Sequence, residues 1–250
     1  MPYAAAVKPV RAALPGEALA AQGPSVTNPP MASPQLTLLL LVPLAYLVGA
    51  TPFGLLVGLW RGVDPRKAGS GNIGATNVGR LLGGRYFALV FSLDLLKGLL
   101  PMLFAGLLLR DQPPSRECYL LWLLIGFAAI AGHMFSIFIR FKGGKGVATS
   151  AGVMLGLFPY FTSAGVFAIL IFLIVFKTTR YVSAASMLGA IGFPAAYLTI
   201  GLLAHWPLLG AQLPLVVFST LVATLIVIKH RTNIARLRAG TEHRAGEART

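Results

Sequence analysis

The sequence has little charge, few acidic residues and almost no cysteine. Charged residues make up 11% of the 250-residue chain, whereas about 25% is usual in soluble domains. Cys118 is the only cysteine, so an intramolecular disulfide is excluded and a cysteine-based metal site is not expected. Seven Asp and Glu residues stand against 21 Lys and Arg residues, which gives a formal net charge of +14. The composition therefore argues against an ordinary soluble domain.

The N-terminal segment lacks a regular pattern. Residues 1–35 are rich in Ala and Pro and show neither helical nor strand periodicity. They also lack the charged region followed by an apolar core that marks a signal peptide. We expect residues 1–35 to form a disordered N-terminal extension and residues 36–246 to form one integral-membrane domain.

Long apolar runs are abundant, since 56% of the residues are hydrophobic. A run of ~18 or more residues with few charges predicts a membrane-spanning helix. The runs predict spans at 36–59, 86–109, 118–139, 184–206 and 212–228.

The apolar stretch 147–176 needs a separate argument. It lies between two polar, basic segments, and these must lie on the same face of the membrane if they serve one site. The stretch then crosses the membrane an even number of times, and Pro159 in "FPYF" (158–161) cannot continue an intact helix. We therefore expect a short hairpin with arms of about fifteen residues, or ~22 Å each, which is less than the ~30 Å hydrocarbon core. The arms are then either tilted short spans or a hairpin that reaches part-way into the membrane, shielded by its neighbours. The predicted fold class is all-α: a polytopic membrane helix bundle of seven helices.

The basic residues are distributed unevenly between the loops. Sixteen Lys and Arg residues lie in 61–85, 140–146, 177–183 and 229–250, against two in 110–117 and 207–211. The positive-inside rule places the first group in the cytoplasm and the N-terminus outside. Because these residues are spread over short loops and not gathered on one domain, we expect no nucleic-acid partner.

A glycine-rich segment at 69–77 reads "GSGNIGATN" and matches the dinucleotide fingerprint G-x-G-x-x-G, with Asp94 twenty residues after Gly74. Its context excludes a dinucleotide fold, because no buried strand precedes it and Asp94 falls inside a predicted span. Backbone N–H groups of a glycine-rich turn can instead form an anion-binding nest. The candidate residues are Ser70, Gly71, Asn72, Gly74, Thr76, Asn77 and Arg80. An ordinary cytoplasmic turn is the alternative.

A second segment, "FKGGKG" (141–146), precedes an expected helix start near Val147. Ammonium groups, backbone amides and a helix N-terminus together suit a phosphate. A Walker A loop is excluded, because Gly146 stands where that motif needs Ser or Thr. The candidate residues are Lys142, Gly143, Gly144, Lys145, Gly146 and Thr149. His133 lies at the end of the preceding span, where both a packing role and a catalytic role stay open.

Two further polar segments follow. In "TTRYVSAAS" (178–186), Ser183 and Ser186 share one helix face, close to Arg180. In "KHRTNIARLRAGTEHR" (229–244), a helix would align three polar side chains, with one acid after them: His230, Asn233, Arg236 and Glu242. A solvated basic tail is the alternative for the last segment.

Asp94 and Lys97 stand three residues apart inside a predicted span. Charges inside a membrane usually pair and face the interior of the bundle, so we expect a structural ion pair here.

Together the polar segments resemble the PlsY family, the integral-membrane glycerol-3-phosphate acyltransferases that use acyl phosphate as donor. The matching residues are "SGNIGATN" (70–77), "GH" with "FKGGKGVATS" (132–133 and 141–150), "TRYVSAAS" (179–186) and "HRTNIARLRAGTE" (230–242). The resemblance runs from about residue 36 to 246. Ser136 departs from it, standing where the family usually has Pro, and Gly79 replaces a usual aliphatic residue.

The resemblance implies transfer of an acyl group from acyl phosphate to the 1-hydroxyl of glycerol 3-phosphate, an early step of phospholipid biosynthesis. The products are 1-acylglycerol 3-phosphate (lysophosphatidic acid) and phosphate. It also implies a multi-pass protein of the bacterial cell (inner) membrane, with its site facing the cytoplasm and a functional link to the enzyme that makes acyl phosphate. No cofactor and no metal are expected.

The expected roles follow from charge and placement. Lys142 and Lys145, with the glycine amides, hold a phosphate and stabilise the leaving group. Arg180, Arg236 and Asn233 hold glycerol 3-phosphate. Ser70, Asn72 and Thr76 complete the anion nest, and Asn72 is placed to reach the acyl carbonyl oxygen. The base stays open between His133, His230, Glu242 and a substrate phosphate.

The sequence does not support the catalytic groups of other acyltransferases. Cys118 lies across the membrane from the motifs and cannot be a nucleophile, and the H-x-x-x-x-D motif of other glycerolipid acyltransferases is absent. The competing function is a membrane transporter for an organic phosphate. Its charged residues should lie near the bilayer midplane, on interrupted helices in two related halves.

Overall fold

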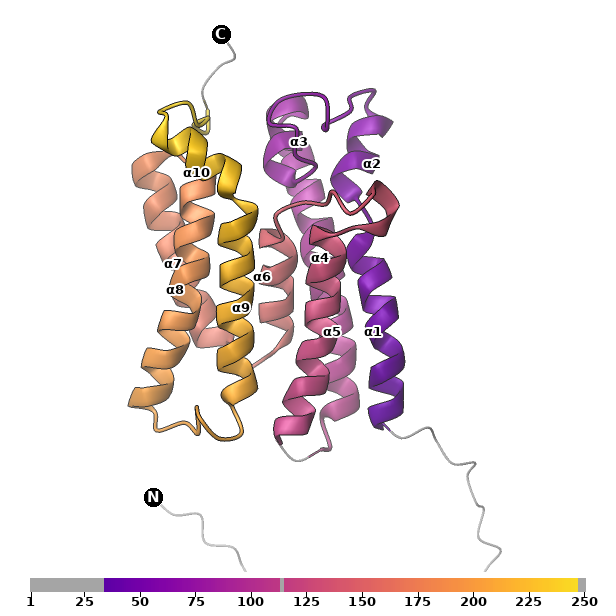
Figure 1. The fold of residues 1–250 in the computed structure, drawn as a ribbon, viewed down its shortest axis with the longest axis vertical. Coiled ribbons are helices and arrows are strands. Elements are labelled where there is room, and N and C mark those ends of the chain that lie inside the picture. Colours follow the sequence, from indigo (N-terminus) through magenta and orange to yellow (C-terminus); the bar gives the residue numbers. More distant parts are fainter. Residues whose placement is uncertain (1–33, 113–114, 247–250) are drawn as a thin grey trace, which may run out of the picture. The chain divides into compact units, whose positions relative to one another are not determined.

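The computed structural model describes residues 34–112 and 115–246, and these residues are all-helical (Figure 1). The α-helices are α1 (Pro34–Ala50), α2 (Phe53–Trp60), α3 (Ala75–Leu82), α4 (Gly84–Leu109), α5 (Arg116–Met134), α6 (Val147–Gly156), α7 (Thr162–Thr179), α8 (Val182–Leu203), α9 (Leu213–Lys229) and α10 (Arg231–Arg238), with one 3-10 helix, η1 (Ile137–Ile139). The all-α class is confirmed. The predicted N-terminal extension, 1–35, lies outside the described residues except for its last two.

Within residues 34–112 and 115–246, five helical segments are long and apolar enough to cross a membrane. They are Gln35–Trp60, Gly84–Leu109, Arg116–Ile139, Thr162–Thr179 and Val182–Leu203. A sixth is the α9–α10 pair, which bends by 55° between its two helices. These segments confirm a multi-pass membrane protein. The predicted spans all fall on helices, within a few residues at each end.

The helix count differs from the predicted seven because hydropathy detects spans and misses short polar helices. α3 and α10 have eight residues each and carry polar side chains, so no apolar run marks them. The first predicted span is also two helices, α1 and α2, separated at Thr51 and Pro52.

The break in the first span leaves backbone carbonyls that other helices satisfy. Lys97 Nζ, from α4, donates a hydrogen bond of 2.9 Å to the Thr51 carbonyl oxygen. The buried Ser136 hydroxyl donates one of 2.5 Å to the Ala50 carbonyl oxygen. A helix end inside a membrane needs such partners because lipid offers none.

The stretch 147–176 forms the predicted hairpin. α6 ends at Gly156, the chain turns through 157–161 around Pro159, and α7 returns. Phe161, 1% exposed, anchors the turn through edge-to-face contacts with Phe193 and Tyr197. The arms are unequal: α6 has ten residues, about 15 Å, and α7 has eighteen. Only α7 is long enough to cross.

Helix packing brings the polar segments to one end of the bundle. α4 packs along α3 and α6, α1 along α5, α7 along α8, and α9 between α8 and α5. Both α3 and α10 lie at the same end, and the loop before α6 and the α7–α8 joint are near it (Figure 1). We call this the α3–α10 end.

Candidate active site

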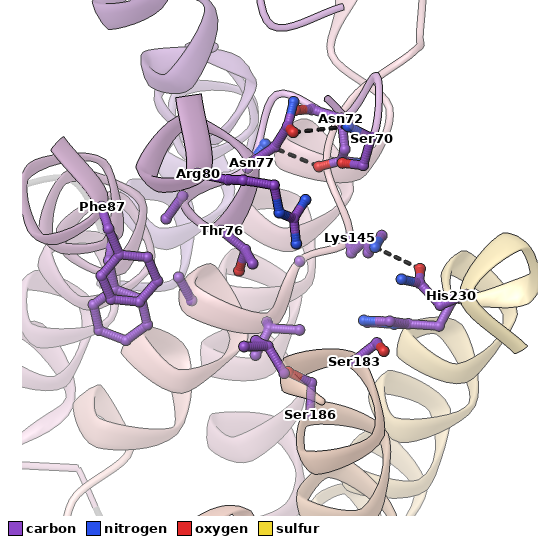
Figure 2. Close-up of a pocket in the computed structure, with 18 of the residues that line it drawn as sticks. Ser70, Asn72, Thr76, Asn77, Arg80, Phe87, Lys145, Ser183, Ser186 and His230 are labelled. Carbon is purple, nitrogen blue, oxygen red and sulfur yellow. Dashed lines mark hydrogen bonds between the residues drawn. The ribbon is translucent and has the colours of Figure 1, made fainter. Parts of the chain in front are cut away.

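A cavity of about 130 Å³ near the α3–α10 end collects residues from all four polar segments (Figure 2). The sequence-predicted residues that line it are Ser70, Asn72, Gly74, Thr76, Asn77, Arg80, His133, Lys145, Gly146, Ser183, Ser186, His230, Asn233, Arg236 and Glu242. Six predicted residues are not in its lining: Gly71, Lys142, Gly143, Gly144, Thr149 and Arg180.

The glycine-rich segment forms the first wall, and Asn77 holds it in shape. The side chain of Asn77 is buried, and its Oδ1 accepts a hydrogen bond of 2.8 Å from the Ser70 N–H. Its Nδ2 donates to three loop carbonyl oxygens, those of Pro65, Ala68 and Asn72, at 3.0, 3.1 and 2.8 Å. Because its hydrogen-bonding capacity is used within the loop, Asn77 positions the other residues of this wall.

The same loop leads into α3, whose first turn faces the cavity. Asn72 Oδ1 accepts a hydrogen bond of 2.9 Å from the N–H of Gly74, the residue that precedes the helix. Ala75 and Thr76, from the first turn, line the cavity, and Arg80 extends into it from one turn later (Figure 2). A helix N-terminus carries N–H groups without intrahelical partners, which favour an anion.

The second wall is the loop before α6, where glycines separate two lysines. The Gly144 N–H donates a hydrogen bond of 3.0 Å to the His133 carbonyl oxygen. A side chain at Gly143 would collide with that carbonyl, and one at Gly144 would collide with the His133 ring. This close packing against α5 leaves Lys142 exposed and places Lys145 in the cavity lining.

Lys145 is the enclosed cation of the site. Its Nζ donates a hydrogen bond of 2.6 Å to Asn233 Oδ1 (Figure 2). Burial, supported by the positive charges of Arg236 and Arg80 and opposed by Glu242, lowers the pKa of Lys145 from 10.5 to about 8. An anion beside this ammonium would favour its charged form.

The third wall is organised around Glu242. Its Oε1 accepts hydrogen bonds from Ser183 Oγ at 2.8 Å and from Asn233 Nδ2 at 2.6 Å. Its Oε2 accepts one of 2.7 Å from Arg236 Nε. Burial alone would raise the pKa of Glu242, but these hydrogen bonds outweigh it and hold the pKa below its ordinary value. Both oxygens of an ionised Glu242 are therefore occupied, which fits positioning better than proton transfer.

His230 lies at the joint between α9 and α10 with its ring directed toward the cavity (Figure 2). Its Nδ1 is 2.7 Å from the Ile226 carbonyl oxygen. A carbonyl oxygen only accepts, so Nδ1 carries the proton, and in the neutral ring Nε2 keeps a lone pair. His230 can thus accept a proton at Nε2.

Three of the predicted residues outside the lining contribute to the backbone structure around the site. Arg180, at the end of α7, accepts a hydrogen bond of 2.8 Å from the Ala245 N–H and donates one of 3.3 Å from Nε to the Ala245 carbonyl oxygen. The carbonyl of Thr149 packs closely against Gly98 of α4. Gly71 has a positive φ of 71°, which the turn requires.

Sequence reasoning missed an aromatic wall and one acid. Phe87 and Phe91 from α4, and Phe172 from α7, line the cavity, and so does Asp94. The predicted ion pair is present, with Lys97 Nζ 2.8 Å from Asp94 Oδ1. Positions 87, 91 and 94 share one helix face by their spacing, and this signal could have placed Asp94 at the site.

Among the described residues, no group of three or more His, Cys, Asp or Glu is placed to hold a metal ion. The arrangement is instead cationic and rich in hydrogen-bond donors, next to apolar helices. It defines an integral-membrane protein with a site for an anionic group beside lipid.

Comparison with known proteins gives the family. The family model described as glycerol-3-phosphate acyltransferase matches residues 39–240. The chain belongs to this family, and it is an acyltransferase of the membrane. The resemblance seen in the sequence is confirmed.

Named relatives and solved structures agree. Glycerol-3-phosphate acyltransferases of Trichlorobacter lovleyi and Aquifex aeolicus are 43% and 41% identical, over 79% and 82% of this chain and 92% and 98% of theirs. A crystal structure of PlsY, an integral membrane glycerol 3-phosphate acyltransferase, in its glycerol 3-phosphate form is 40% identical with a TM-score of 0.71, covering 84% of this chain and 96% of that one. The crystal structure of PlsY in its lysophosphatidic acid form is 39% identical with a TM-score of 0.69, and it has the same coverage.

Proposed function

We propose that this protein transfers a fatty acyl group from acyl phosphate to the 1-hydroxyl of glycerol 3-phosphate. The bond between the acyl carbon and the phosphate oxygen breaks, and an ester bond to the glycerol oxygen forms. The hydroxyl proton ends on the released phosphate. The products are 1-acylglycerol 3-phosphate and inorganic phosphate, and a reaction that makes acyl phosphate must supply the donor.

The observation that carries this proposal is the enclosed Lys145, with Arg80 and Arg236 lining the same cavity. Both substrates bear phosphate, and the cavity offers three cations together with the N-terminal turn of α3. Because burial disfavours the Lys145 ammonium, charge developing on a leaving phosphate would be stabilised there more than in water. An acyl phosphate is already activated, so positioning and charge stabilisation suffice.

The polar side chains fit the remaining roles. Ser70, Asn72 and Thr76 lie beside the α3 amides and suit the acyl carbonyl oxygen and a phosphate. His230 is placed to take the proton of the attacking hydroxyl at Nε2, because Nδ1 is held by the Ile226 carbonyl oxygen; burial and the charge of Lys145 lower its pKa to about 4, so a proton taken there passes readily to the phosphate. Asn233 links Lys145 to Glu242 and keeps both in place.

The aromatic wall supports a lipid substrate. Phe87, which is 38% exposed, stacks on Phe91 at a centroid distance of 5.7 Å, and Phe172 lines the cavity from α7. These rings offer an apolar path from the cations to the outer faces of α4 and α7, where an acyl chain meets lipid. The positive-inside count supports a cytoplasmic position for this end, and the resemblance supports the inner membrane of a bacterial cell.

The alternative, a transporter for an organic phosphate, is less well supported because the cations gather near one end of the bundle. One assay separates the two. Purified protein in detergent receives acyl phosphate with and without glycerol 3-phosphate, and phosphate release is followed. We expect release to depend on the acceptor; release at equal rates with and without it, or none, would reject the enzyme.

A further inference from the structure

Asp94 places a second carboxylate on the cavity wall, and its surroundings differ from those of Glu242. Its side chain is 4% exposed, on α4. Lys97 Nζ lies 2.8 Å from Oδ1, but among the described residues Oδ1 accepts no hydrogen bond of acceptable geometry. Glu242, in contrast, accepts from three side chains.

His133 faces Asp94 with a second buried atom that lacks a hydrogen bond to any described residue. His133 Nδ1 lies 3.6 Å from Asp94 Oδ1, which is too long for a hydrogen bond. Nδ1 too has no hydrogen-bond partner in the part of the chain that the structure describes. Both side chains are more than nine-tenths buried, and both residues line the cavity. Buried polar atoms are nearly always paired in folded proteins, so this pair of atoms is suited to a ligand group.

The chemistry of the two atoms selects the ligand group. A phosphate oxygen would be repelled by the Asp94 carboxylate and belongs with Lys145, Arg80 and Arg236. A hydroxyl group both donates and accepts, so it can donate to Asp94 Oδ1 and accept from a protonated His133 Nδ1. An oxygen placed roughly 2.8 Å from each atom closes the 3.6 Å gap with ordinary hydrogen-bond lengths.

We propose that Asp94 and His133 form a subsite for the 2-hydroxyl of the acceptor, an assignment that rests on the proposed function. The cavity then has two parts: cations bind the phosphate of the acceptor, and a carboxylate binds a hydroxyl of its uncharged glycerol part. Holding the phosphate and the 2-hydroxyl fixes the direction in which glycerol 3-phosphate lies, and with it the position of the 1-hydroxyl. Asp94 and His133 thus determine specificity for a vicinal diol phosphate.

The test compares glycerol 3-phosphate with 3-hydroxypropyl phosphate, which lacks only the 2-hydroxyl. A hydrogen bond to a charged group predicts that the wild-type protein prefers glycerol 3-phosphate by about 10- to 100-fold in kcat/KM. In Asp94→Asn we expect the preference to fall at least fivefold, through a loss with glycerol 3-phosphate alone. A purely structural role would lower both rates equally.

Asp94→Asn leaves the Lys97 ammonium without its counter-ion, so this variant can fail to fold, and a second variant is needed. The double variant Asp94→Leu, Lys97→Met removes both charges, and we expect it to show the same reduced preference. Asp64→Asn is the matched control, because Asp64 pairs with Arg66 in the loop before the site and does not line the cavity. Its preference should equal that of the wild type.

The outcomes separate the two proposals. If the wild-type protein releases no phosphate in response to glycerol 3-phosphate, the proposed function is rejected, whatever the preference between the two acceptors. If it does so but shows no preference, or if the variants keep the wild-type preference, the function stands and the hydroxyl subsite is rejected.

Discussion

Replacing Lys145 by methionine removes the ammonium group while keeping most of the side chain's length. The lowered pKa, about 8 against 10.5, means that burial disfavours this charge by about 3 kcal/mol in the unliganded protein. A phosphate that pairs with Lys145 recovers this energy, most fully where charge develops on the leaving group. Loss of one such preorganised donor typically costs about 3–4 kcal/mol of transition-state stabilisation. We therefore expect the turnover of Lys145→Met to fall by at least 100-fold.

Lys142 provides the matched control, three residues earlier in the same glycine-rich loop. It is exposed and does not line the cavity, so Lys142→Met should keep turnover within about twofold. The assay is initial-rate phosphate release in detergent, with elution as one symmetrical peak as the measure of folding. The yield of folded Lys145→Met protein should equal that of Lys142→Met, because removing a buried charge relieves a desolvation cost. Equal effects of the two substitutions on turnover would refute the assignment of Lys145 as the enclosed cation.

Three further predictions concern the same cavity. Pairing with the phosphate of the donor needs the charged form of Lys145, which is present below a pKa of about 8, so KM for acyl phosphate should rise about tenfold per pH unit above pH 8 and stay flat in Lys145→Arg. Ending the chain after Gly240 removes Glu242, so turnover should fall at least 100-fold while the unfolding temperature drops by only a few degrees. Asn77→Ala deletes the hydrogen bonds that hold the first wall, which should lower stability by about 2–4 kcal/mol, measured as thermal unfolding in detergent; an unchanged transition would contradict its positioning role.

The membrane spans could be predicted because hydropathy and length are properties of the sequence alone. The hairpin at 147–176 needed one more physical constraint, that two basic segments share a face, and Pro159 supplied the turn. The short helices α3 and α10 could not be found in this way. Eight residues form a stable helix only with tertiary support, and the contacts of Val78 with α4 or of Asn233 with Glu242 are invisible before folding.

The four segments of the site were also predictable, but the direction of each side chain was not. Lys142 and Lys145 are equivalent by residue type, and only the packing of Gly143 and Gly144 against His133 separates them. Arg180 lies outside the cavity lining, and its Nε donates a hydrogen bond to the Ala245 carbonyl oxygen. Such choices depend on neighbours distant in sequence, which no local pattern contains.

Lys97 connects the scaffold to the site and shows why a membrane bundle carries buried charge here. Its Nζ lies 2.8 Å from Asp94 Oδ1 on the cavity wall and also donates to the Thr51 carbonyl oxygen at the break between α1 and α2. Beyond this break, Gly54 of α2 packs directly on the backbone of Ile73, within the glycine-rich wall. One ammonium thus satisfies a carbonyl that lipid could not and neutralises a carboxylate on the cavity wall. The break between α1 and α2 and the acid on the cavity wall thus share one lysine, whose charge would be costly in lipid without both partners.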